Sequence, residues 1–108
     1  MESNLCFTAD KYQEILETRF RIPREDVPLI LNKLNSAEPV IKQAFVDVVE
    51  GKDIELVVHD ISYQLLVSDL CMTPLAALLS LDWVMREPEN ALKAFRKEIV
   101  RWKMEGKI

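Results

Sequence analysis

Glycine is scarce in this sequence, which has only two glycines, Gly51 and Gly106, among 108 residues. Each follows a stretch with a helical pattern, and glycine often stands directly after the end of a helix. Loops that bind phosphate need several glycines, because backbone N–H groups must come close to the ligand. The sequence therefore predicts neither a P-loop nor a dinucleotide-binding turn.

Histidine and cysteine are equally rare. The single histidine, His59, can share a metal ion with Glu55, but a complete site needs two further ligands, which have no evident source. We therefore predict no metal, no cofactor and no catalytic residue, and expect a partly buried His59 bonded to Glu55 or to the backbone. Cys6 and Cys71 lie far apart without CxxC spacing, so we expect two buried thiols in a reducing compartment.

Long apolar runs are also missing. The uncharged stretch 70–81, LCMTPLAALLSL, is shorter than the roughly 20 residues that cross a bilayer. Thr73 and Pro74 interrupt this stretch. Threonine is a residue type that caps helices, and proline suits the first position of a helix. Glu2 stands where a signal peptide would have a positive charge. These features predict a helix start inside the stretch and a cytoplasmic protein.

Apolar residues recur at helical spacing along most of the chain. The expected helices are 9–20, a short helix opened by Asp26 and Pro28 and ending near Asn35, one capped by Ser36 and stopped by Gly51, 53–72, 74–86 and 89–104. The β-branched residues of 54–58 are typical of a strand, but no partner strand and no Asn-Gly turn accompany them, which favours helix. We predict an all-α, compact bundle of five to six helices, forming one domain over residues 1–108.

Two of these expected helices have apolar residues on two faces. In 74–86 the broad stripe contains Ala77, Leu78, Leu81, Val84 and Met85, and a minor stripe contains Ala76, Leu79 and Trp83. In 53–72 a second face includes Leu66 and Leu70. Because an ordinary surface helix has one apolar face, both faces here must be covered. The second faces are either core, or an interface formed by Ala76, Leu79, Trp83, Leu66 and Leu70 with another protein or a second copy.

Charge is distributed unevenly around a net value of −4. Residues 43–85 contain seven acidic side chains and one basic, whereas 93–107 contain six basic and two acidic. The candidate basic strip consists of Lys93, Arg96, Lys97, Arg101 and Lys103. It is either a solvated helix face or a contact for nucleic acid or an acidic partner. A helix-turn-helix is disfavoured, because 37–50 offers one cation, Lys42, against three carboxylates.

The predicted function follows mainly from these exclusions. We expect a small, non-enzymatic helical protein that acts by protein–protein interaction or self-association, such as an adaptor, an inhibitor, or an immunity- or accessory-type factor. No membrane contact and no small-molecule substrate are predicted. The alternative is a nucleic-acid-associated protein that uses the basic C-terminal helix.

Overall fold

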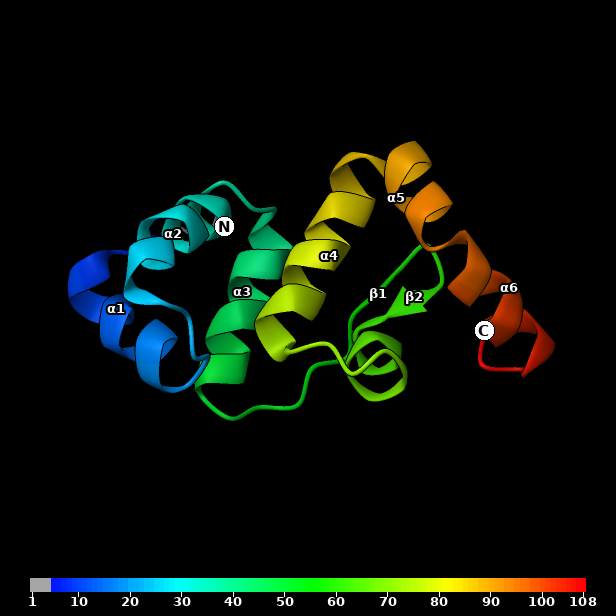
Figure 1. Cartoon of the computed structure of the whole chain (residues 1–108), viewed down its shortest axis with the longest axis horizontal. Helices are drawn as coiled ribbons and strands as arrows, with labels where there is room; N and C mark the ends of the chain where they lie inside the picture. Colours follow the sequence, from blue (N-terminus) through cyan, green and yellow to red (C-terminus); the bar gives the residue numbers. More distant parts are fainter. Residues whose placement is uncertain (1–4) are drawn as a thin grey trace.

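The computed structural model describes residues 5–108 and is mostly helical (Figure 1), which confirms the all-α prediction. Glu2, on which the expected localisation partly depends, lies outside the described residues. The α-helices are α1 (Ala9–Thr18), α2 (Val27–Asn35), α3 (Pro39–Val49), α4 (Pro74–Arg86), α5 (Pro88–Ala94) and α6 (Arg96–Met104). A 3-10 turn, η1 (Arg24–Asp26), leads into α2.

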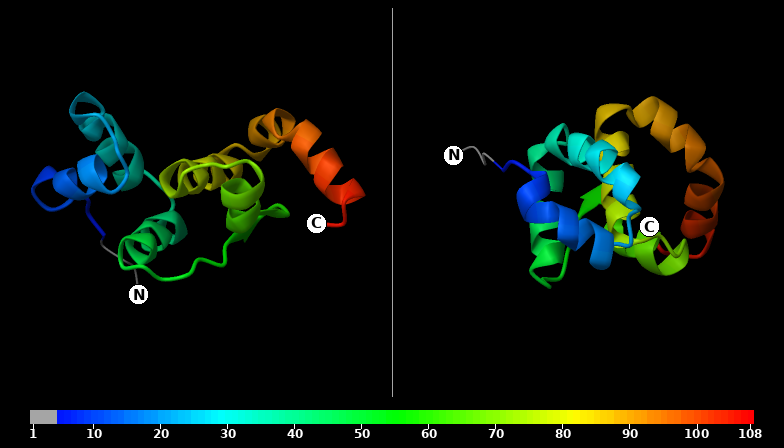
Figure 2. Two further views of the ribbon diagram at one scale, coloured as in Figure 1. Left: turned by 60° about the horizontal axis from the view of Figure 1, so that its bottom comes forward. Right: turned by 60° about the vertical axis from the view of Figure 1, so that its left-hand side comes forward.

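Helix α4 lies at the centre of this arrangement (Figures 1 and 2) and contacts α3 on one side and α5 on the other. Its broad stripe is core as predicted, with Ala77, Leu78, Leu81 and Val84 fully buried. Helices α1 to α3 occupy one end of the molecule, while α5, α6 and a small hairpin occupy the other. The molecule measures 45 × 31 × 25 Å along its principal axes.

Aromatic packing holds the end formed by α1 to α3. The rings of Phe7 and Tyr12 meet edge to face with centroids 5.1 Å apart, and Phe7 meets Phe45 in the same way at 5.4 Å. Phe20 packs on Phe45 at 5.5 Å. The side chain of Asn35 binds both backbone groups of Phe7, accepting from its N–H at 2.7 Å and donating to its carbonyl at 2.8 Å. This pair of hydrogen bonds ties the segment before α1 to the end of α2.

The expected helix over 53–72 is wrong in its first half. Strands β1 (Val57–Val58) and β2 (Ile61–Ser62) pair antiparallel there, with Val57 opposite Ser62 and Val58 opposite Ile61. The second half contains a single π-helical turn, η2 (Leu65–Asp69), instead of an α-helix. The β-branched residues of 54–58 therefore follow their strand preference.

The turn of this hairpin explains why it was missed. His59 and Asp60 are its two central residues, with φ of 48° and 69°. Two-residue hairpin loops favour turns in which both central residues have positive φ, commonly Asn-Gly. Histidine and aspartate also adopt positive φ more readily than most residues, so His-Asp serves here instead. His59 is exposed at the loop tip, which corrects the expectation that it is partly buried.

Several predicted helix boundaries are confirmed. The amide of Ala76 donates to Thr73 Oγ1 at 3.2 Å, and Pro74 is the first residue of α4. Gly51 has φ of 80° just after α3, as expected of a residue that ends a helix.

Two details of the predicted helices are wrong. Ser36 does not cap α3. It directly follows α2, and the residue that stands before α3 is Glu38. The helix expected over 89–104 is divided at Phe95, whose φ of −93° and ψ of 9° separate α5 from α6.

Candidate protein-binding groove

The minor stripe of α4 lies at the surface. Trp83 keeps 37% of its surface exposed, which is unusual for so large an apolar side chain. Ala76 is exposed and Leu79 is half-buried against the core. The core therefore leaves part of the minor stripe uncovered, mainly Ala76 and Trp83.

Leu79 and Trp83 form part of a groove between the C-terminal halves of α2 and α4, with a volume of about 970 Å³. The residues that line it are Asn32, Lys33, Ser36, Leu79, Asp82, Trp83, Arg86 and Glu87. Two apolar side chains are thus framed by polar and charged ones. This composition is typical of the middle and rim of a protein interface.

Asp82 fixes the floor of the groove. Its Oδ1 accepts from the backbone N–H of Glu38 at 2.8 Å, and its Oδ2 accepts from Arg86 Nη1 at 3.3 Å. The first N–H groups of a helix have no partner within the helix, so this carboxylate supplies one for α3 from a neighbouring element. From the sequence, Asp82 is only a charged residue between the two apolar stripes. Its contact with Glu38, 44 positions away, leaves no signal in the local spacing of residues.

The remaining candidate interface residues lie elsewhere. Leu66 is fully buried in the chain's own core, so it is not available to a partner in this fold. Leu70 is partly buried against the same core. The sequence left open whether this second face is core or interface, and the fold places Leu66 in the core. The candidate interface is therefore confined to α4 and the end of α2.

All five members of the basic strip are exposed, and four of them form no ion pair within residues 5–108: Lys93 on α5, and Arg96, Lys97 and Lys103 on α6. The fifth, Arg101, is ion-paired with Asp69 of η2 and with Glu105.

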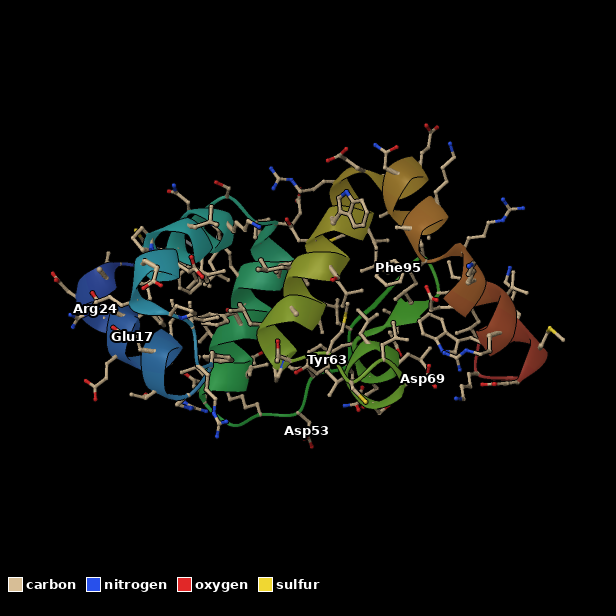
Figure 3. All side chains as sticks on the ribbon, viewed as in Figure 1. Glu17, Arg24, Asp53, Tyr63, Asp69 and Phe95 are labelled. Atoms are coloured by element: carbon tan, nitrogen blue, oxygen red, sulfur yellow. The ribbon has the colours of Figure 1, made fainter. Side chains whose placement is uncertain are left out.

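Asp69 is the centre of a cluster that faces α6 (Figure 3). Besides Arg101, it accepts from Trp102 Nε1 at 2.9 Å and from Lys107 Nζ at 2.8 Å. These hydrogen bonds, led by the one from Arg101, hold the pKa of Asp69 far below its usual range. Asp69 in turn raises the pKa of Arg101 and of Lys107. Sequence reasoning missed this cluster, because Asp69 lies more than 30 positions from each of its three partners.

Both cysteines differ from expectation, since Cys6 and Cys71 are free and exposed instead of buried. Among residues 5–108, no group of three or more His, Cys, Asp or Glu side chains is placed to hold a metal ion. Within that same range, no helix has both the length and the apolar character needed to span a bilayer.

Comparison with known proteins gives no relative. No family model, no curated protein and no solved structure matches the chain. The groove and the charged surfaces are therefore the basis for assigning a function.

Proposed function

We propose that this chain is a small helical protein-binding module, of the adaptor, inhibitor, or immunity- or accessory-type class. The groove between α2 and α4 is its binding site, and the partner is another protein. The single observation that carries the proposal is Trp83, an exposed tryptophan beside Leu79 in a groove between two helices.

Tryptophan contributes more binding energy than almost any other residue at protein interfaces, above all when it is surrounded by contacts that exclude water. Trp83 has such surroundings, because Lys33, Arg86 and Glu87 stand around it as a polar rim. The hydrogen bonds of Asp82 to α3 and to Arg86 hold the floor in place before a partner arrives. A fixed site loses less conformational entropy on binding.

The charges of the groove indicate what kind of segment it accepts. Lys33 and Arg86 are balanced by Asp82 and Glu87, so the groove has no net charge. Selection by charge is then weak, and apolar side chains of the partner supply most of the affinity. A segment that places such side chains along one face of a helix suits a groove between two helices.

The test uses three leucine-to-glutamate variants. Leu79→Glu should leave a folded, cooperatively melting protein that no longer binds the partner of the wild-type chain. Leu81→Glu should unfold the chain, because an unpaired carboxylate would be placed in the core. Leu29→Glu is the matched control, since Leu29 is 55% exposed on α2 and does not line the groove.

Circular dichroism reports the fold, and titration with the partner purified from the source cell reports binding. Trp83→Ala should weaken that binding by at least about tenfold, the loss typical of a hot spot. If Leu79→Glu unfolds the chain as fully as Leu81→Glu does, the minor stripe is part of the core and the proposal fails. If Leu29→Glu and Leu79→Glu reduce binding equally, the groove is not the binding site.

The alternative, nucleic-acid binding through Lys93, Arg96, Lys97 and Lys103, has support from their exposure alone. It makes a distinct prediction, because binding to phosphates releases counterions and falls steeply with added salt. A salt titration with generic duplex DNA separates the two functions. Binding that survives Leu79→Glu and is lost in salt would favour the alternative.

We also propose that the protein acts in the cytoplasm. Exposed free thiols tend to oxidise in secretory compartments, and both Cys6 and Cys71 are of this kind.

A further inference from the structure

The outer face of α6 combines exposed apolar and basic side chains. Val100 and Met104 stand one helical turn apart and are 52% and 84% exposed. Arg96, Lys97 and Lys103 flank them and are exposed as well. Two neighbouring apolar side chains among exposed cations make this face a candidate contact surface.

The cations of this outer face are unpaired, in contrast to the cations that hold α6 against η2. Across residues 5–108, no carboxylate forms an ion pair with Arg96, Lys97 or Lys103. Arg101 and Lys107 are instead tied to Asp69. The inner side of α6 is therefore occupied, and the outer face keeps its charge for another molecule.

A surface of opposite charge lies beside α3. A hollow of about 150 Å³ is lined there by Val40, Gln43, Ala44, Asp47, Asp53, Ile54, Glu55 and Leu56. Its walls supply three carboxylates and no cation, and Val40 is exposed at its edge.

Two of the three carboxylates are available to a partner. Asp53 and Glu55 form no ion pair or side-chain hydrogen bond with any other residue of the range 5–108, and Asp53 points outward from the loop after α3 (Figure 3). Asp47 accepts from Gln43 at 3.0 Å and lies 4.0 Å from Lys52. The hollow thus has an apolar floor beneath a negative rim.

We infer that the outer face of α6 in one copy docks into the acidic hollow of a second copy. Met104 enters the hollow, and Lys97 and Lys103 face the carboxylates of Asp53 and Glu55. A cavity of about 150 Å³ accepts a group the size of benzene, so the hollow suits one side chain. Complementary charges orient the approach of the two copies and fix the register.

The two surfaces of one copy cannot meet each other. In all three ribbon views η2 and the hairpin lie between α6 and the loop that carries Asp53 (Figures 1 and 2). The contact therefore joins unlike surfaces of separate copies, which produces head-to-tail chains or rings, or a two-fold dimer in which the contact is made twice. It involves neither Leu79 nor Trp83 and is independent of the proposed groove.

Two charge-reversal variants test this inference. The first, Lys97→Glu with Lys103→Glu, changes α6, and the second, Asp53→Lys with Glu55→Lys, changes the hollow. The mass of the wild type in sedimentation should rise with protein concentration, and each variant alone should stay at the 12.5 kDa of one chain. Each reversal should weaken self-association at least about tenfold, because like charges then face each other.

Mixing the two variants is the decisive step. The intact α6 of the second meets the intact hollow of the first, and the reversed α6 of the first meets the reversed hollow of the second, so the mixture should assemble although neither variant does so alone. The wild-type assembly should also dissociate when salt shortens the Debye length from about 10 Å at 0.1 M to about 3 Å at 1 M. No other mode of association predicts both results.

The controls separate this contact from the other surfaces. Lys11→Glu with Arg24→Glu changes the net charge equally at distant exposed sites and should associate like the wild type, as should Trp83→Ala. The inference is overturned if the wild type stays monomeric at low salt, if either reversal variant still assembles, or if the mixture fails to assemble. It is equally overturned if the wild type binds duplex DNA through α6 without assembling.

Discussion

The two ends of the molecule are held together by different forces. At the α1 to α3 end, Phe7, Tyr12, Phe20 and Phe45 pack their rings against one another. At the opposite end, α6 is held by one carboxylate, Asp69, together with the buried ring of Trp102. Apolar packing is insensitive to acid and salt, whereas an exposed ion cluster is sensitive to both.

This difference indicates which part of the chain opens first. Local stability follows the number of buried apolar contacts, and α6 contributes one fully buried side chain, Trp102. Helix α3 contributes Ile41, Ala44 and Phe45 to the core. We therefore expect α6 to open while the α1 to α3 end remains folded.

The largest effect is expected from Phe45→Ala. Phe45 is fully buried and meets the rings of Phe7, Tyr12 and Phe20. Removing a buried aromatic ring costs about 3–5 kcal/mol, which is much of the stability of a small domain. Chemical denaturation measures the loss, and Val40→Ala, at an exposed site on the same helix, should cost under about 0.5 kcal/mol. Equal losses in the two variants would contradict a core built on this aromatic cluster.

A smaller effect is expected from Asp82→Ala, at the contact between α3 and α4. The variant leaves the amide of Glu38 without its partner and frees Arg86. A hydrogen bond to a charged group contributes about 1.5–3 kcal/mol. The unfolding free energy should fall by that amount, and the exposed Asp10→Ala should change it little. A neutral Asp82→Ala would mean that the groove floor is not fixed by this side chain.

The features that the sequence predicted correctly are those whose cause lies within a few residues. Thr73 and Pro74 define the start of α4 because capping acts over one helical turn. Helical spacing also set Leu79 and Trp83 apart as a second stripe, but it left open whether the core covers them, and the fold buries Leu79 partly.

What was missed depends on contacts between distant residues or on an uncommon turn. The Asp82–Glu38 contact spans 44 positions and the Asp69–Lys107 contact spans 38, so neither appears in a local pattern. The hairpin turn used His-Asp where Asn-Gly was sought. Leu66 was expected on a second apolar face of one straight α-helix, as core or interface, while it lies fully buried in a π-helical turn.

A local effect is expected from Asp69→Asn at the α6 end. The variant keeps the size of the side chain but loses the charge that attracts Arg101 and Lys107. Amide hydrogen exchange should speed up in 96–104 and stay unchanged in α1 to α3. Glu105→Gln is the control, because Glu105 is exposed and pairs with the same two cations. If exchange rises equally in both variants, Asp69 has no special part in holding α6.

The mildest perturbation is acid. The pKa of Asp69 is lowered in the folded chain, so its contribution to stability is fully present above the unfolded value of about 3.9. That contribution is lost as the pH falls below this value toward the folded pKa. Emission from Trp102, isolated in a Trp83→Phe background, should therefore shift to the red in acid while the α1 to α3 end keeps its helical signal.

High salt should reduce this shift and move it to higher pH, because it screens the exposed cations from the carboxylate and weakens the pairing already at neutral pH. Asp69→Asn should remove the dependence, since the amide does not titrate in this range. The ring of Trp102 would then already be wetter at neutral pH. If the emission of Trp102 instead changes only when the whole chain unfolds, the two ends form one cooperative unit. The α6 end would then be no less stable than the α1 to α3 end.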